Sequence, residues 1–161
     1  MAIDKAQLMV GMTIKPAYCA MDIDAATDLE AIEILAKNLV AAGAVKESFI
    51  PAIIKREREY CTGLLFDDMG IAIPHTDAEH VNEASVAIGV LKNPIMFQSM
   101  GMPDIPCKVE MLFMLAIKEP HSQLKFLQTL MQTFQTPGRL TALKACKTAQ
   151  EATELFQSYF D

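Results

Sequence analysis

The sequence contains no tryptophan, only three histidines, and no pair of cysteines at CxxC spacing. Its four cysteines are dispersed, so we expect buried free thiols rather than a disulfide or a cysteine-rich zinc site; they are Cys19, Cys61, Cys107 and Cys146. Basic residues are also in deficit, with 14 Lys and Arg against 20 Asp and Glu, a net charge of −6. Phosphate contacts require a basic face, so this balance argues against a general nucleic-acid-binding protein.

Long apolar runs and targeting signals are missing as well. The longest apolar stretches fall well short of a membrane span, and the beginning, MAIDKAQLMVGMT, lacks the pattern of a signal peptide. We therefore expect a cytoplasmic protein. With 161 residues and 52% hydrophobic content, the chain is large enough to bury a core, and we expect one domain over residues 1–161.

Buried strands are predicted where the apolar runs are densest. KVEMLFMLAI (108–117) has the unbroken apolar character of a central strand, and ASVAIGVL (84–91) is similar. Shorter strands are expected in residues 14–23, in LLF (64–66) and in IAI (71–73). The segment 93–107 contains three prolines and is expected to be rich in loops.

Helical spacing of apolar residues predicts five helices, over 28–43, 46–60, 121–135, 137–146 and 148–160. We expect Asp28 to cap the first and Gly43 to stop it. The third carries an apolar stripe of Leu124, Leu127, Leu130, Met131 and Phe134. Helices before, among and after strands predict the α/β class, as a mixed central sheet flanked by helices in α/β/α layers.

The stretch GIAIPHTDAEH (70–80) raises the question of function. An apolar strand ends at Pro74, which lacks an N–H group, and His75 follows directly. Two further segments carry suitable chemistry. KREREYCTG (55–63) offers Arg56 or Arg58 as a fork for an anion, and His121 stands where a helix follows a central strand. Such a group favours phosphoryl transfer, which mainly needs positioning and stabilisation of oxygen charge.

Each of these features has a plainer interpretation. His75 is explained equally by a hydrogen-bonded surface residue, KRERE by a solvated helix end with local ion pairs, and His121 by a helix cap. A metal site at His75 and His80 has poor spacing, and no HExxH, GxSxG, P-loop or GxGxxG motif is present. From the residues alone, an anion site centred on a histidine is modestly favoured, and no cofactor or metal is expected.

The combination RE…TG…GIAIPH resembles the enzyme IIA component of the bacterial phosphoenolpyruvate-dependent sugar phosphotransferase system, in its fructose/mannitol-type branch. The resemblance implies that His75 is phosphorylated and that the site arginine is Arg56, followed by Glu57; Arg58–Glu59 is the rival alignment. It also implies a second site histidine, His121, and supporting roles for Glu57, Thr62 and Pro74. The longer segment LLFDDMG and the continuation HTDAEH are similar to the galactitol-type subgroup.

The resemblance further implies the partners. The phosphocarrier HPr would donate the phosphoryl group, and a cognate IIB component, associated with a membrane IIC permease, would accept it. A second hypothesis is a regulatory IIA-like domain whose phosphorylation state a partner reads. The length of the chain favours transport over regulation. A third, a metal-dependent hydrolase, would require tight metal binding at His75 and His80.

Overall fold

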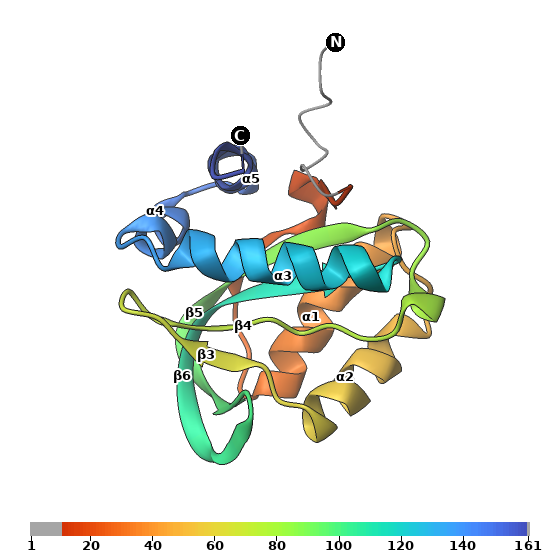
Figure 1. Ribbon diagram of the computed structural model, residues 1–161, viewed down its shortest axis with the longest axis horizontal. Helices are drawn as coiled ribbons and strands as arrows, with labels where there is room; N and C mark the ends of the chain where they lie inside the picture. Colours follow the sequence, from red (N-terminus) through yellow and green to blue (C-terminus); the bar gives the residue numbers. More distant parts are fainter. Residues whose placement is uncertain (1–10, 161) are drawn as a thin grey trace.

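The computed structural model describes residues 11–160, apart from the side chains of Pro120, Ser122 and Gln123 (Figure 1). The expectation about a signal peptide concerns mostly residues 1–10, which lie outside the described part. The strands are β1 (Thr13–Ile14), β2 (Ala20–Ile23), β3 (Gly63–Leu65), β4 (Gly70–Ala72), β5 (Ser85–Ser99) and β6 (Met102–Ala116). The helices are α1 (Asp28–Ala41), α2 (Phe49–Glu59), α3 (Pro120–Phe134), α4 (Arg139–Ala145) and α5 (Ala149–Ser158), with short 3₁₀ turns at Pro16–Tyr18 and Ala78–His80.

The sheet is built around the long antiparallel pair β5–β6, in which Val86 lies opposite Leu115 and Phe97 opposite Cys107. β1 and β2 pair with β5 in parallel, and β4 pairs with β6 in parallel, so the sheet is mixed. β3 pairs with β4 in antiparallel fashion and also meets the far end of β5. β6 thus lies between β4 and β5, as expected of the central strand at 108–117.

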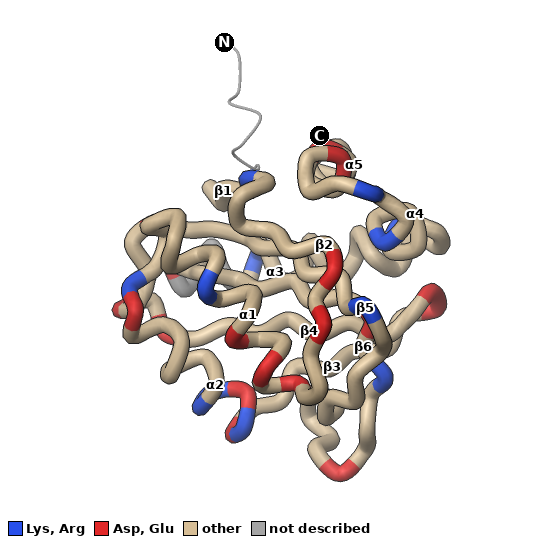
Figure 2. The backbone as a smooth tube through the Cα atoms, turned by 180° about the vertical axis from the view of Figure 1, so that it is seen from behind, with Lys and Arg blue, Asp and Glu red and all other residues tan. Residues whose placement is uncertain are grey.

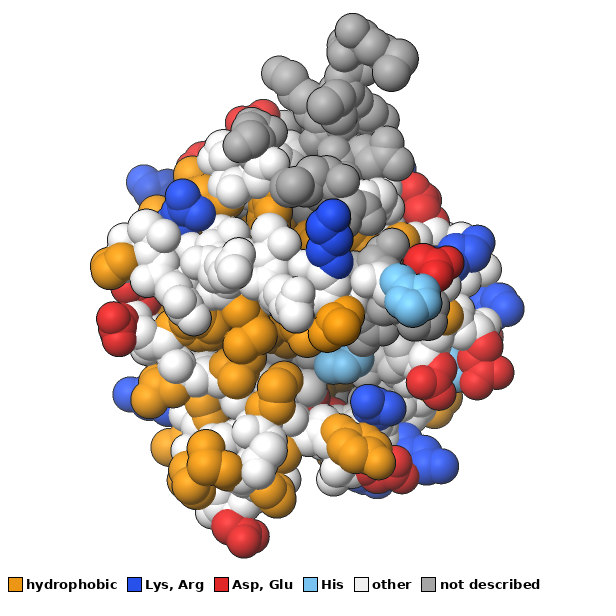
Figure 3. All heavy atoms as spheres, in the orientation of Figure 1, with side chains coloured by type: hydrophobic (Ala, Val, Ile, Leu, Met, Phe, Trp, Pro, Cys, Tyr) orange, Lys and Arg blue, Asp and Glu red, His pale blue; other side chains and the backbone are white. Residues whose placement is uncertain are grey.

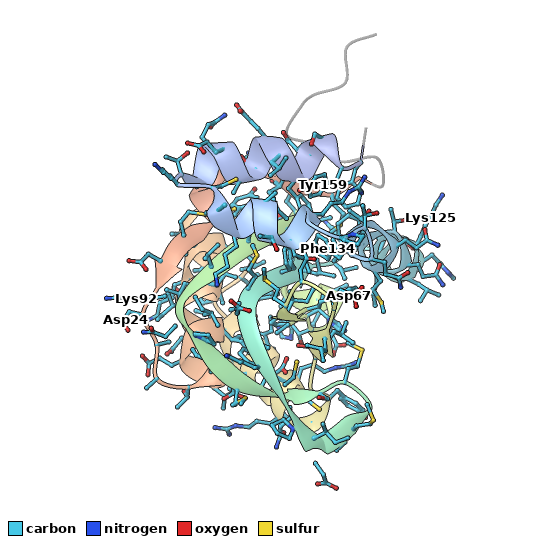
Figure 4. All side chains as sticks on the ribbon, turned by 90° about the vertical axis from the view of Figure 1, so that its left-hand side faces the viewer. Asp24, Asp67, Lys92, Lys125, Phe134 and Tyr159 are labelled. Atoms are coloured by element: carbon cyan, nitrogen blue, oxygen red, sulfur yellow. The ribbon has the colours of Figure 1, made fainter. Side chains whose placement is uncertain are left out.

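Helices cover both faces of this sheet. Successive side chains of a strand point to opposite faces. Leu112 of β6 lies opposite Gly89, where an added Cβ atom would lie 3.1 Å from the side chain of Leu35 from α1. The next residue, Phe113, packs against Phe134 of α3 with ring centroids 4.6 Å apart, on the other face (Figure 4). The predicted α/β/α layers are therefore confirmed.

The aromatic rings join α3 and α5 to the sheet as one cluster. Phe113 also stacks on Phe156 of α5 at 5.9 Å, and Phe126 of α3 stacks on Phe160 at 5.7 Å. The buried side of α3 differs from the predicted stripe, because Phe126 is fully buried whereas Leu124 is 60% exposed. The helix thus turns Leu124 toward solvent.

Two details of the N-terminal half differ from expectation. The predicted strand at 14–23 is broken into β1 and β2 by a 3₁₀ turn that begins at Pro16, a favourable position for proline. The N-cap of α1 is Thr27, whose hydroxyl accepts a hydrogen bond from the Glu30 N–H group at 3.2 Å; Asp28 is the first helical residue. Gly43, with φ of 76°, follows the end of α1 as predicted.

The segment 93–107 was expected to be loop-rich, and this prediction is wrong. It forms the outer part of the β5–β6 hairpin. Pro94 and Pro103 fall where the register shifts, and Pro106 lies opposite Gln98. A proline disrupts a strand only where its missing N–H group would join the ladder, so irregular or edge positions accept it.

Cysteine and membrane expectations can also be compared with the structure. All four cysteines are free; three are buried, and Cys146 is partly exposed. Within residues 11–160, no helix combines the length and the apolar character needed to cross a bilayer.

The loop between β3 and β4 caps a distant helix. The N-cap residue of α4 is Gly138, which has no side chain to offer. The carboxylate of Asp68 replaces it, accepting hydrogen bonds from the N–H groups of Gly138 at 3.0 Å and Thr141 at 3.1 Å. These hydrogen bonds, led by that from Gly138, lower the pKa of Asp68. The longer LLFDDMG segment therefore anchors the C-terminal helices to the sheet.

We predict that Asp68→Ala lowers the free energy of unfolding by about 1 kcal/mol, the usual cost of losing a cap. A carboxyl with a lowered pKa stabilises the fold above its unfolded pKa, and this contribution is lost as pH falls through the folded pKa. The difference between the variant and the wild type should therefore shrink in acid. Denaturant unfolding at several pH values measures it. Asp67→Ala, at an exposed neighbour, is the control, and equal losses in both variants would contradict the cap.

Candidate functional site

His75 lies where the chain leaves the pairing between β4 and β6. Pro74 has no N–H group, but its carbonyl oxygen accepts a hydrogen bond from the Leu115 N–H group at 2.9 Å. His75 itself forms a single parallel bridge with Leu115. In Figure 1 the segment after β4 runs toward the end of the sheet at which α3 begins. The proline therefore interrupts the ladder while its carbonyl still ties His75 to the central strand.

The ring of His75 is half-buried and held through one nitrogen. Its Nδ1 atom is 2.9 Å from the carbonyl oxygen of Ile73. A carbonyl can only accept, so Nδ1 carries the hydrogen and the neutral ring keeps its lone pair on Nε2. Burial lowers the pKa of His75, and the positive charge of Arg56 lowers it further, against the opposing effects of the Ile73 bond and Asp77. The environment therefore favours the neutral ring, with Nε2 as the nitrogen whose lone pair is free.

Arg56 is the arginine that lies close enough to act on His75 electrostatically. Its Nε atom is buried and has no hydrogen-bond partner in the described part of the chain. Its guanidinium group stacks on the ring of Tyr60, with Cζ 4.4 Å from the ring centroid. Arg58 is exposed on the charged end of α2, where Figure 2 shows blue and red positions alternating. The geometry thus favours Arg56 over Arg58 as the arginine beside His75.

Glu57 points away from this charge and into the protein. Only 4% of its surface is exposed, so KRERE is not simply a solvated helix end. Its two oxygens pair with Thr62, one with the N–H group at 2.9 Å and the other with the hydroxyl at 2.8 Å. The Thr62 hydroxyl in turn accepts a hydrogen bond from the Ile73 N–H group at 3.2 Å. Glu57, Thr62 and Ile73 form a chain of contacts that ends at the residue whose carbonyl holds His75.

His121 is exposed in the first turn of α3. Glu119 occupies the N-cap position of this helix, so the alternative that His121 caps it is wrong. Figure 3 shows histidine side chains, in pale blue, at the surface that α3 crosses, with basic and hydrophobic side chains near them. The strand that precedes α3 is the strand that pairs with His75, so the topological premise for bringing His121 near His75 is met. A catalytic role for His121 stays a prediction.

His80 belongs to a different set of contacts. Its Nδ1 atom is 2.8 Å from the hydroxyl of Ser48 at the start of α2, and its Nε2 atom is 3.6 Å from a carboxylate oxygen of Glu79. Among residues 11–160, no group of three or more His, Cys, Asp or Glu side chains is arranged to hold a metal ion. The metal-dependent hydrolase hypothesis gains no support from this geometry.

One residue of the site was missed from the sequence. Tyr60 lies four positions after Arg56, the spacing at which helical side chains become neighbours, and this spacing was the signal available. Its ring is 60% exposed while one side covers the guanidinium group. Stacking of this kind holds an arginine in place without neutralising its charge.

Fold and site together define a mixed α/β domain with a half-buried histidine, of lowered pKa, near an arginine. The family model described as "Phosphoenolpyruvate-dependent sugar phosphotransferase system, EIIA 2" matches residues 12–159. The chain belongs to this family. It is a phosphotransferase carrier that works through a phosphohistidine.

The chain is also similar to one curated protein in sequence and to two solved structures in fold. The galactitol-specific EIIA component of Escherichia coli K12 is 29% identical over 114 residues, covering 71% of this chain and 75% of that protein. A structure of the complex of enzyme IIA mannitol and phosphorylated enzyme IIB mannitol from E. coli matches with a TM-score of 0.72 and 20% identity, covering 90% of this chain and 99% of that one. The nitrogen regulatory protein IIA-Ntr from Neisseria meningitidis matches with a TM-score of 0.69 and 20% identity, covering 88% and 94%. The two structures are similar in fold.

We predict that Arg56→Met raises the pKa of His75, because the variant loses the positive charge that lowers it. Titration of the His75 ring signals by NMR measures this in the unphosphorylated protein. Arg58→Met removes the same charge from an exposed position two residues away and serves as the control. A larger rise with Arg58→Met than with Arg56→Met would support the rival alignment.

Proposed function

We propose that His75 accepts a phosphoryl group from HPr and passes it to a cognate IIB component during uptake of a sugar or sugar alcohol. The observation that carries this proposal is the hydrogen bond from His75 Nδ1–H to the carbonyl oxygen of Ile73. It leaves Nε2 as the attacking nitrogen. The membership of the chain in the EIIA family supplies the reaction class.

The chemistry follows from this arrangement. The lone pair on Nε2 forms a bond to phosphorus, while the bond from phosphorus to the donor breaks and its electron pair stays on the donor. The ring then bears positive charge, which the hydrogen bond from Nδ1–H to Ile73 stabilises. The reverse sequence transfers the group to the next carrier, and no metal is needed to balance either step.

Arg56 is proposed to stabilise the oxygens of the phosphoryl group as it moves. Its buried, unpartnered Nε atom is a hydrogen-bond donor without an acceptor among the described residues, which fits a site that receives an anion only transiently. Its planar fork can contact two oxygens at once. Glu57, Thr62 and Pro74 are proposed as supporting residues, and His121 as a second site histidine.

The partner surface is proposed to surround these residues. Tyr60, beside Arg56, and Leu124, one turn after His121, are each 60% exposed. Exposed apolar side chains around a charged site are typical of a surface that docks other proteins. The solved complex of a relative with its phosphorylated IIB component supports IIB as a partner, and HPr follows from the family.

Galactitol is the first sugar to test. The proposal rests on the 29% identity to a galactitol-specific EIIA component and on the longer segment before the IAIPH motif. Sugar specificity within this system lies mainly in the permease. The property of this chain that would reveal the sugar is therefore its preference among IIB components.

We predict that incubation with phosphoenolpyruvate, enzyme I and HPr labels the wild-type protein on His75 and that the label is stable in base and lost in acid. Onward transfer should be faster to a galactitol-type IIB component than to a mannitol-type one. Mass spectrometry locates the label, and quenched time points give the rates. His80→Ala, at a histidine outside the site, should label normally. Label that persists in His75→Ala would reject the assignment of the acceptor, whereas equal rates to both IIB components would reject only galactitol.

We predict that His121→Ala is still labelled on His75 but transfers the group to IIB about tenfold more slowly, as expected if one hydrogen bond to a phosphoryl oxygen is lost. Quenched-flow transfer from the phosphorylated variant measures this step alone. His121→Gln, which keeps a side-chain donor, should recover part of the rate. Onward transfer at the wild-type rate in a folded His121→Ala protein would remove His121 from the site.

A further inference from the structure

A buried acid, Glu57, is linked through one residue, Thr62, to Ile73, two positions before His75. Glu57 is 4% exposed, yet it pairs with no cation in the described structure and uses both oxygens on Thr62. Buried carboxyl groups are costly unless their hydrogen bonds repay the loss of water. The burial of Glu57 therefore indicates a role that an apolar side chain could not fill.

We propose that Glu57 and Thr62 are positioning residues that orient the Ile73 backbone and, through its carbonyl, fix the tautomer of His75. The inference rests on the proposed function for the identity of His75 as the phosphoryl acceptor. It adds the means by which Nε2, rather than Nδ1, is left free.

The Ile73 backbone is held on both sides of its Cα atom. Its N–H group has two acceptors on one residue, the hydroxyl oxygen of Thr62 at 3.2 Å and the carbonyl oxygen of Thr62 at 3.3 Å. Its own carbonyl accepts from His75 Nδ1–H. Both groups are attached to the same Cα atom, so holding the N–H side limits the directions open to the carbonyl. Pro74 narrows them further, because a residue before proline is restricted to extended backbone.

Thr62 is in turn held by Glu57. Its N–H group and its hydroxyl both meet the carboxyl of Glu57, so this residue is held at two points by a side chain from α2. The hydroxyl has two lone pairs and one hydrogen. It can therefore accept from Ile73 whether it donates to an ionised Glu57 or accepts from a protonated one. The contact to Ile73 survives in either state of the acid.

The charge of Glu57 is shifted by its burial. Burial raises its pKa to about 7, its hydrogen bonds to Thr62 oppose this, and Asp28 of α1 adds a smaller rise. Arg56 and Asp77 are the charged groups that act on His75. The carboxyl of Glu57 can therefore keep its contacts with Thr62 while its charge changes. Glu57→Gln, which offers one donor and one acceptor, matches its protonated form.

The test uses the tautomer of His75, read from ring ¹⁵N shifts of the unphosphorylated protein, together with the rate of labelling from HPr. Wild-type protein should show hydrogen on Nδ1. Thr62→Val keeps the side-chain shape without the hydroxyl, and it should give a mixture of tautomers and about tenfold slower labelling. Thr62→Ser restores the hydroxyl and should restore both. Glu57→Gln should keep the Nδ1–H tautomer, whereas Glu57→Leu should lose it.

Glu59→Leu, at an exposed position on the same helix, is the matched control and should change neither readout. A purely structural role predicts lower stability in Thr62→Val and Glu57→Leu with the wild-type tautomer and rate. That result in folded variants would overturn the inference. If Thr62→Val and Glu57→Leu fail to fold, Thr62→Ser is the deciding variant, because it keeps the hydroxyl that contacts Ile73, and a mixture of tautomers in it would overturn the inference. The tautomer is measured without any transfer. Wild-type protein that takes no label on His75 would therefore reject the proposed function, while altered tautomers in Thr62→Val and Glu57→Leu would still support the inference.

Discussion

The hydrogen bond from the Leu115 N–H group to the Pro74 carbonyl is the contact on which the site depends. Proline removes a donor from the strand but leaves its acceptor, so the chain stays attached to β6 on one side only. The bridge between His75 and Leu115 follows from it. The inner part of β6 is buried and pairs with both β4 and β5, so the position of His75 is set by a strand that is bonded on both sides.

The buried carboxyl of Glu57 shows how stability and function oppose each other here. Its pKa is raised to about 7, so the folded protein favours the protonated form, and the stabilisation of that form is lost as pH rises from the unfolded value through the folded one. An apolar residue would avoid this loss. An apolar residue would also leave the N–H group and hydroxyl of Thr62 without their acceptor. The acid is therefore best understood as part of the scaffold of the site rather than of the core.

The sequence predicted those parts of the fold in which one physical signal acts alone. Residues 111–116 are apolar throughout, and they form the buried inner part of the central strand β6. The segment 93–107 was misread because a proline count says nothing about which N–H groups a hairpin leaves unpaired. Leu124 was assigned to the buried stripe because it follows helical spacing, but Phe126 takes the core side, and this choice depends on aromatic partners contributed by α5 and residue 160. His75 was singled out by the apolar strand that stops at Pro74, and the family resemblance implied Arg56 rather than Arg58. The contacts of Glu57 with Thr62 and of Tyr60 with Arg56 are tertiary details that no spacing specifies fully.

The adjacency of Arg56 and Glu57 explains why the arginine stays available. Neighbouring residues on a helix do not face each other, so an acid directly after an arginine need not neutralise it. Here the carboxyl of Glu57 is occupied by Thr62, and the guanidinium group of Arg56 rests on the uncharged ring of Tyr60. The positive charge is thereby held near His75, where it adds to burial in lowering the pKa of the ring, and the buried Nε atom of Arg56 has no hydrogen-bond partner among the described residues. An arginine paired with a carboxylate would have to break that pair each time a phosphoryl group arrived.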